Sequence, residues 1–272
     1  MLAKKINMHS NFQLAFKFIK YYLTAANGKG HGIHSPFVYD FVRKVLNKKN
    51  TPQNVAAIEA RRKSLELNDT RIEVMDRGAG SRQSDVTLRP ISVIAKSALK
   101  QKKMSQLLYR MVVYFSPNAL LEMGTSFGIT TSYLAMSLPN QKLVTMEGAP
   151  AIAKEAKNTF EILNLNNIEI VEGDFATSLP AYLHSISNVG MVYIDGNHRF
   201  QPTMEYFYLL LSNVNEQSIL IFDDIYWSAE MEKAWEEIKK HPAVTLTIDL
   251  FYIGIVFFRK ENKQQQHFKI RY

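Results

Sequence analysis

The sequence predicts an α/β protein in which a helical first part precedes a mostly parallel sheet. Three observations support this fold class. From residue 119 onward, short apolar runs alternate with helical segments of about 10–15 residues, as in parallel strands joined by helical crossovers. The first 115 residues instead show helical periodicity broken by glycine and proline. Several strand-like runs end in an acidic residue, which puts carboxylates at the sheet edge where open α/β folds bind ligands.

The first part is expected to be helical and to end at Ser116-Pro117, which divides the chain into domains 1–115 and 116–272. Ser35-Pro36 is a typical helix start, a hydroxyl cap followed by proline at the first helical position. Arg77–Arg82 is rich in glycine and carries two arginines, so it is a candidate lid, with a plain linker as the alternative. Helices are expected near 12–23, 36–46, 52–67 and 91–115.

The second part is expected to hold the sheet. Strands are expected near 119–123, 142–147, 168–172, 190–195 and 218–223, and helices near 127–138, 150–164, 175–186, 201–212 and 228–240. Two final β-rich runs, Val244–Leu250 and Ile253–Arg259, are separated only by Phe251-Tyr252. That connection is too short for a helical crossover, so the two runs are expected to pair antiparallel. The glutamines at 264–266 are expected to belong to a frayed tail.

Composition favours a cytoplasmic protein. The chain has no cysteine, which excludes disulfides and thiolate metal sites and suits a reducing compartment. Lys17 and Lys20 interrupt the apolar residues near the start, so no secretory signal is expected. No apolar run approaches the roughly 18–20 residues that a membrane span requires.

Charge is distributed unevenly along the chain. Residues 1–115 carry 21 Lys+Arg against 7 Asp+Glu, whereas residues 116–272 carry 12 against 18. A basic first part can attract a polyanion, an acidic small molecule or an anionic membrane face. The alternative is an ordinary solvated, lysine-rich helical surface.

The ends of the first three strands predict a nucleotide-type cofactor site. Glycine at 124 allows a tight turn, and glycine at 128 allows the next helix to pack closely. Hydroxyl groups surround the start of that helix, where an anionic group is favoured. Glu147 follows Gly124 by 23 residues, near the offset at which an acidic residue accepts ribose hydroxyls. The candidate cofactor-binding residues are Glu122, Gly124, Thr125, Ser126, Gly128, Thr130, Glu147, Gly173, Asp174 and Asp195.

These motifs, in this order, resemble the class I S-adenosylmethionine-dependent methyltransferases over about residues 117–260. The Glu-x-Gly-x-Ser-x-Gly spacing differs from the Gly-x-Gly-x-x-Gly of dinucleotide sites, and no P-loop is present. The resemblance implies a Rossmann-like sheet of seven strands, mostly parallel with an antiparallel last strand, and S-adenosylmethionine as cofactor. It also implies that Asp174 accepts from the adenine amino group.

A closer resemblance is to the catechol- and caffeoyl-type O-methyltransferases. Asp195-Gly-Asn-His198 is similar to their Asp-x-x-Lys segment, and Asp223-Asp224-Ile-Tyr-Trp227 to their Asp-Asn-x-x-Trp segment. The resemblance implies Asp195, Asp223 and Asp224 as ligands of a divalent cation and His198, with Asp195, as catalytic. Oxygen ligands would suit Mg²⁺, Ca²⁺ or Mn²⁺. Histidine in place of lysine can act as a base near neutral pH without special tuning.

Three functions remain open at the level of sequence. The first is methyl transfer to an oxygen of a small-molecule acceptor, an acidic one being compatible with the basic first part. The second is methylation of RNA or another nucleic acid, with residues 1–115 as the electrostatic footprint. The third is a non-catalytic, cofactor-binding regulatory module. The apolar helices before residue 115 could also pack across a homodimer.

Overall fold

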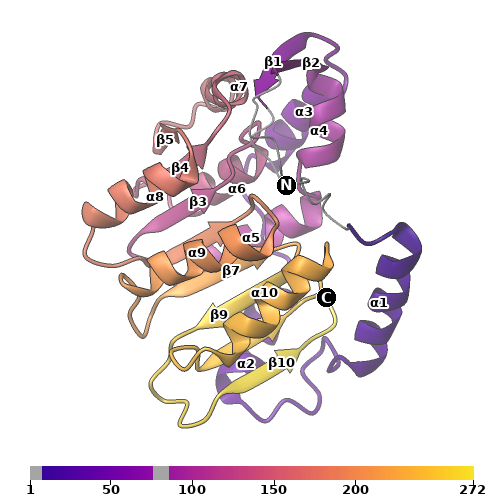
Figure 1. Ribbon diagram of the computed structural model, residues 1–272, viewed down its shortest axis with the longest axis vertical. Helices are drawn as coiled ribbons and strands as arrows, with labels where there is room; N and C mark the ends of the chain where they lie inside the picture. The colour runs from indigo at the N-terminus through magenta and orange to yellow at the C-terminus, as the bar shows by residue number, and fades with distance from the viewer. Residues whose placement is uncertain (1–7, 76–85) are drawn as a thin grey trace, which may run out of the picture. The chain divides into compact units, whose positions relative to one another are not determined.

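The computed structural model describes residues 8–75 and 86–272, so the candidate lid Arg77–Arg82 lies outside the described residues. The chain forms two compact units (Figure 1). Unit 1 consists of Met1–Lys48, Pro117–Ala119 and Leu179–Tyr272, and unit 2 of Lys49–Ser116 and Leu120–Ser178. Each unit therefore combines residues from both sides of Ser116, while the two domains predicted from the sequence stay a prediction.

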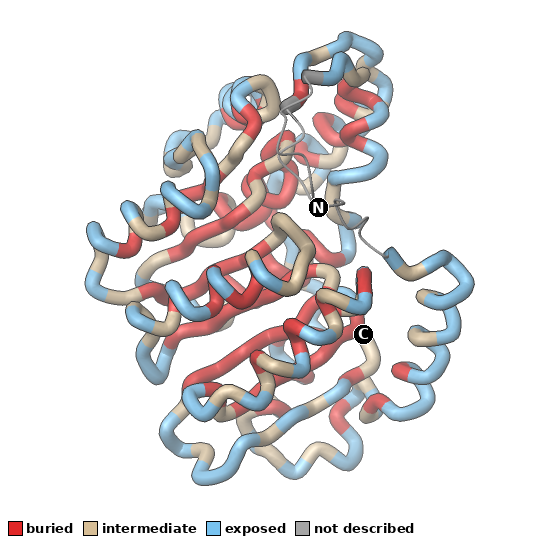
Figure 2. Tube along the Cα trace, viewed as in Figure 1, coloured by how far each residue is buried: buried red, intermediate tan, exposed pale blue. Residues whose placement is uncertain are grey.

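Unit 1 begins with helix α1 (Asn11–Thr24). A capping box fixes its start, since the amide of Gln13 donates to Ser10 Oγ and the amide of Ser10 donates to Gln13 Oε1. Tyr21 is buried, whereas Phe12 and Phe16 are exposed on the other side of the helix. Figure 2 shows α1 as mostly exposed.

Strand β9 (Ile253–Phe257) is the antiparallel member of the sheet in unit 1. It lies between β7 (Ile219–Asp223) and β8 (Leu246–Asp249) and runs antiparallel to both. Strand β6 (Met191–Ile194) pairs parallel with β7. The predicted antiparallel pairing of the last two β-rich runs is therefore confirmed. In Figure 1, helices α9 (Phe200–Leu211) and α10 (Ala229–Lys240) cover one face of these strands.

The frayed tail predicted at 264–266 is wrong at Gln266, which begins strand β10 (Gln266–Lys269). This strand pairs parallel with β8, and the Gln265 side-chain amide donates to the carbonyls of His241 and Val244. Ile270 follows as a fully buried residue. Three of the four residues of β10 are polar, so a single apolar residue, Phe268, is too weak a signal for the sequence pattern to reveal this edge strand.

Unit 2 contains three parallel strands, with β4 (Leu143–Glu147) between β3 (Leu120–Met123) and β5 (Ile168–Glu172). Helix α6 (Ile129–Ser137) follows β3, α7 (Pro150–Ile162) follows β4, and α8 (Phe175–His184) follows β5 and continues into unit 1. Their order and approximate bounds agree with the sequence prediction. Figure 2 shows β3 and β4 as buried.

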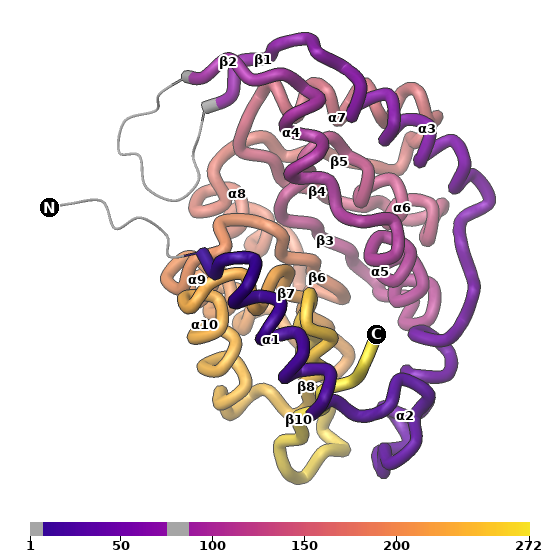
Figure 3. The backbone as a smooth tube through the Cα atoms, turned by 90° about the vertical axis from the view of Figure 1, so that its right-hand side faces the viewer, coloured from indigo at the N-terminus to yellow at the C-terminus, as the bar shows by residue number. Residues whose placement is uncertain are grey.

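The N-terminal part of unit 2 departs from the prediction in two ways. The single helix expected over 91–115 is two helices, α4 (Ile91–Ala98) and α5 (Lys102–Phe115), because the backbone at Leu99 and Gln101 is extended. An unpredicted antiparallel hairpin joins β1 (Arg71–Met75) and β2 (Val86–Pro90). The hairpin lies beside α4 (Figure 3).

The remaining helices complete the two units. Helix α3 (Val55–Glu66) of unit 2 buries Arg61, which binds Glu155 and Thr159 of α7. In unit 1, Ser35 caps α2 (Pro36–Phe41) as expected, and a short π-helical turn, η1 (Val42–Leu46), follows. The longest described helices, α1 and α5, have 14 residues each, short of the ~20 needed to cross a bilayer, so no described helix is a candidate membrane span.

Candidate functional site

In unit 2, Glu122 lies beneath the turn between β3 and α6. Its side chain is fully buried, and its Oε2 accepts hydrogen bonds from the hydroxyls of Thr131 (2.5 Å) and Thr145 (2.7 Å). Thr145 also contacts Thr125 through their hydroxyls, 2.7 Å apart. A buried carboxylate requires such partners. Glu122 therefore stabilises the turn by binding side chains on both of its sides, Thr131 of α6 and Thr145 of β4. Its contact with a cofactor stays a prediction.

Glu147, the last residue of β4, organises the upper side of the same turn. Its Oε2 accepts from the amide of Ser126 (3.0 Å) and its Oε1 from the amide of Ala149 (2.9 Å). Burial raises the pKa of Glu147, although these backbone N–H groups oppose the shift. The two strand ends are therefore joined through this carboxylate, which keeps further lone pairs for a hydroxyl-bearing ligand.

Ser126 carries a buried polar atom without a hydrogen-bond partner. Its backbone has φ 49°, and its Oγ finds no partner among the described residues. Buried hydroxyls are nearly always hydrogen-bonded in native proteins. The unpartnered Ser126 hydroxyl beside Glu147 therefore fits a position where a ligand group would supply the hydrogen bond. Thr130 lies nearby in the first turn of α6 and is 9% exposed.

Gly128 and Gly173 have different local requirements. A Cβ at Gly128 would lie 2.5 Å from the Phe160 ring, so glycine is what allows α6 to pack on α7, as expected from the sequence. At Gly173 (φ 141°) a Cβ would meet nothing within 4 Å, so the end of β5 is open. Asp174 is exposed, and its Oδ1 accepts from the amide of Ala176 at the start of α8.

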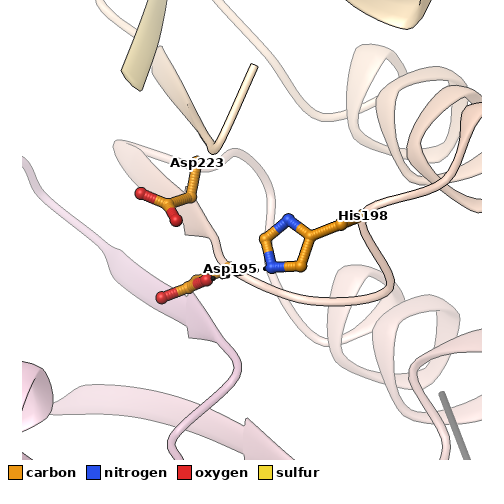
Figure 4. Close-up of side chains that lie close together, drawn as sticks. All are labelled: Asp195, His198 and Asp223. Carbon is orange, nitrogen blue, oxygen red and sulfur yellow. Dashed lines mark ion pairs between the residues drawn. The ribbon is translucent and has the colours of Figure 1, made fainter. Parts of the chain in front are cut away.

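In unit 1, Asp195, His198 and Asp223 form a cluster at the ends of β6 and β7 (Figure 4). One ligand atom from each lies within 4.8 Å of the others. His198 Nε2 is 3.3 Å from Asp195 Oδ1, and the histidine ring faces that carboxylate. Burial lowers the pKa of His198, but the hydrogen bond and charge of Asp195 and the charges of Asp223 and Asp224 outweigh it, so the net shift is upward.

Tyr193 belongs to this cluster and was missed by the sequence analysis. Its buried hydroxyl lies 3.0 Å from Asp195 Oδ2 and 3.1 Å from Asp223 Oδ1. One hydroxyl proton cannot serve two carboxylates at once, so the tyrosine fixes their separation while the cluster attracts a further proton or a cation. Strand alternation could have found it, because Tyr193 in β6 lies two positions before Asp195, the residue that follows the strand.

Asp224 follows Asp223 but is not one of the three clustered residues. Its amide donates to the carbonyl of Tyr252 (2.6 Å), and its φ is 52°. It lines a separate pocket of unit 1 together with Tyr226 and Trp227. The predicted metal ligands Asp195 and Asp223 are therefore together, while the role of Asp224 as a third ligand stays a prediction.

Comparison with known proteins finds similarity to methyltransferases. Residues 121–225 match the family model described as a methyltransferase domain. The chain shares the fold of the SAH-bound methyltransferase PaMTH1 of Podospora anserina, at 12% identity and TM-score 0.60 over 83% of this chain and 97% of that one. It is also similar to an O-methyltransferase from Bacillus cereus in complex with SAH, at 18% identity and TM-score 0.54 over 81% and 97%.

A third similar structure is the O-methyltransferase TomG from Streptomyces achromogenes, involved in tomaymycin synthesis and in complex with SAM. It has 19% identity and TM-score 0.51 over 60% of this chain and 82% of that one. No protein with a curated description matches the sequence. Residues 121–225 therefore match a methyltransferase domain, and the chain has the fold of the methyltransferase structures named above.

Proposed function

We propose that the protein transfers the methyl group of S-adenosylmethionine to an oxygen of a small-molecule acceptor. The observation that carries the oxygen assignment is the contact between His198 and Asp195, held by Tyr193 at the end of β6. A hydroxyl must lose its proton as it is methylated, and a histidine oriented by a carboxylate is a typical general base.

The cofactor would bind at the strand ends of unit 2. Glu147 would accept the ribose hydroxyls, and the unpartnered hydroxyl of Ser126 would meet the ligand beside it. The start of α6 favours the carboxylate of the methionine moiety, because unpaired backbone N–H groups and the helix dipole face it. Asp174 would accept from the adenine.

S-adenosylmethionine, when bound, supplies a methyl group activated by a positively charged sulfur. The acceptor oxygen forms a bond to the methyl carbon as the carbon–sulfur bond breaks, which leaves a neutral thioether. Nε2 of His198 faces Asp195, so the hydroxyl proton passes to the other ring nitrogen, Nδ1, and Asp195 and Asp223 stabilise the resulting imidazolium. The rest of the rate enhancement comes from alignment and exclusion of water.

A divalent cation is a second element of the proposal. Asp195 and Asp223 offer adjacent carboxylates, and such oxygen ligands suit Mg²⁺, Ca²⁺ or Mn²⁺, while His198 keeps its role as the base. A bound cation would lower the pKa of an acceptor hydroxyl. Titration of the protein with Mn²⁺ followed by calorimetry tests this. Binding that disappears in the variant Asp223→Asn supports the cation, and absence of binding rejects it.

The other functions considered from the sequence gain no support. Arg61, Arg62 and Arg110 are buried, so part of the basic excess before residue 115 does not face solvent. Lys17 and Lys44 are paired with Glu232 and Asp40. Small-molecule methylation in the cytoplasm therefore remains the proposal, and a homodimer stays a prediction.

A screen with labelled methyl donor tests the function. Phenolic, carboxylate and RNA acceptors are offered to the wild type and to His198→Ala. The proposal requires label in a hydroxyl-bearing small molecule and a loss of about 10²–10⁴-fold in kcat for the variant, the usual contribution of a general base. Label transferred only to RNA, or an unchanged kcat in the variant, would reject it.

A further inference from the structure

The pocket beside Asp224 has walls from three distant parts of unit 1. Helix α1 contributes Phe18, the segment after β7 contributes Tyr226 and Trp227, and the turn between β8 and β9 contributes Phe251 and Tyr252. The cavity is about 300 Å³, at the lower end of the range for small-molecule sites and sufficient for one ring with a short substituent.

Phe251 lies at the centre of this aromatic group. Tyr226 stacks on it at 5.0 Å with nearly parallel rings, while Phe18 (5.0 Å) and Tyr252 (5.2 Å) meet it edge-on. Trp227 and Tyr252 remain 39% and 46% exposed, so parts of these rings are available to a ligand. The ring faces carry negative electrostatic potential and attract cations.

The turn that presents these rings is held in a costly conformation. Phe251 has φ 70°, a left-handed backbone that costs about 1–2 kcal/mol for a bulky residue. Asp249 holds both sides of the pocket, because its Oδ1 accepts from the amide of Phe251 (2.9 Å) and its Oδ2 from the hydroxyl of Tyr226 (2.6 Å). Backbone strain of this kind is typical of ligand-binding positions.

Helix α1 is held in place by contacts before its first residue, at its middle and near its end. His9, just before the helix, and Lys17, in its middle, bind Glu232 of α10 (2.6 and 2.8 Å between the closest atoms). At its end, the hydroxyl of Tyr21 donates to the carbonyl of Ile270. Phe18 therefore forms a fixed wall of the cavity.

The charge in the pocket has one sign. Asp224 is the ionisable acid among the described lining residues, and none of those residues is basic. Its charge also contributes to the raised pKa of His198, so the pocket and the Asp195–His198 pair share one electrostatic environment. An acidic acceptor would be repelled here, whereas a cation would meet both the carboxylate and the aromatic faces.

From this geometry we infer that the pocket binds a protonated or quaternary amine attached to a ring, with Asp224 and the faces of Trp227 and Tyr252 as its contacts. The inference rests on the proposed function, because it identifies the acceptor as a hydroxyl compound that also carries an ammonium group. It differs from the acidic acceptor that the basic first part of the sequence suggests.

Three probes of matched size test the pocket: phenethylamine as its ammonium form, neutral 2-phenylethanol and anionic phenylacetate. Each is titrated into the full chain in the presence of a chelator, with the fluorescence of Trp227 as the signal; the other tryptophan, Trp235, is buried. The ammonium is expected to bind about tenfold more tightly than the alcohol, and phenylacetate most weakly.

Variants separate charge from shape. Asp224→Asn keeps a side chain that tolerates the left-handed backbone and should abolish the ammonium preference while leaving the alcohol affinity unchanged. Phe18→Ala should weaken both probes about tenfold, whereas Phe16→Ala on the exposed side of α1 should change neither. Glu216→Gln, an exposed carboxylate outside the pocket lining, is the charge control.

The outcomes distinguish this inference from the proposed function. Phenylacetate binding as tightly as the ammonium, or an ammonium preference that survives Asp224→Asn, would overturn the pocket assignment. S-adenosylmethionine binding is measured on the same samples. If the cofactor binds while the probes are not discriminated, only the pocket assignment fails; if the probes are discriminated and the cofactor does not bind, only the methyltransferase proposal fails.

Discussion

Replacing Glu147 by glutamine is expected to weaken S-adenosylmethionine binding about 10- to 100-fold with little effect on folding. The carboxylate accepts backbone hydrogen bonds from Ser126 and Ala149 and, in the proposed complex, the ribose hydroxyls. Glutamine keeps one acceptor oxygen, so its amide nitrogen would face either a backbone N–H or a ribose hydroxyl that needs an acceptor.

The magnitude follows from these contacts. A hydrogen bond to a charged group contributes about 1.5–3 kcal/mol, and 1.4 kcal/mol corresponds to a tenfold change in affinity, so loss of one such bond gives the expected range. The loss of stability should be smaller, about 1 kcal/mol, because burial already disfavours the ionised form of Glu147, as its raised pKa indicates, and a neutral amide relieves that penalty.

Calorimetric titration with S-adenosylmethionine and urea unfolding measure the two effects. Glu172→Gln is a matched control, because Glu172 pairs in register with Glu147 at the same end of the sheet but is exposed and bound to Lys157. It should leave affinity unchanged and stability within about 0.5 kcal/mol. Equal affinity in the wild type and Glu147→Gln, or equal losses in both variants, would refute the assignment of Glu147.

Three further predictions concern the fold and the cluster. Gly128→Ala should destabilise the protein by about 2–4 kcal/mol in urea unfolding, because the added Cβ would meet the Phe160 ring. Gly32→Ala is the control: this glycine has φ 80° and no neighbour within 4 Å, so the variant should lose only about 1 kcal/mol. Equal losses in the two variants would exclude the clash. Tyr193→Phe should lower kcat about tenfold or more without changing KM for the cofactor, and an unchanged kcat would remove its positioning role. The raised pKa of His198 should make kcat/KM fall as pH drops through the pKa of the folded protein, which lies above 6.5. The protonated histidine also stabilises the fold. This stabilisation is complete below pH 6.5 and is lost as pH rises through the folded pKa. Unfolding of His198→Gln across this range checks the second effect, since a difference from wild type that does not change with pH contradicts it.

Sequence patterns were sufficient for the elements that depend on local signals. The strands β3 to β7 are apolar runs bounded by turn residues, and their ends bring Glu147 and Ser126 together as expected. Asp195 and His198 also meet, because only two residues separate them at the end of β6. These features depend on residues close together in the sequence and on the rule that the carboxyl ends of parallel strands meet at one edge of the sheet.

The remaining features depend on contacts between distant residues. The pocket forms because Phe18 meets Phe251 across more than 200 residues, and no periodicity encodes that pairing. Strand β10 is mostly polar, and its pairing with β8 rather than its own sequence pattern defines it. Tyr193 could have been found, since it lies in β6 two positions before Asp195, which follows that strand.

Calorimetric titration of the wild-type protein with S-adenosylmethionine tests the central claim most directly. The account predicts saturable binding with one site per chain, and a thermal unfolding midpoint that rises with cofactor concentration. Absence of heat at millimolar cofactor, together with an unchanged unfolding midpoint, would contradict it.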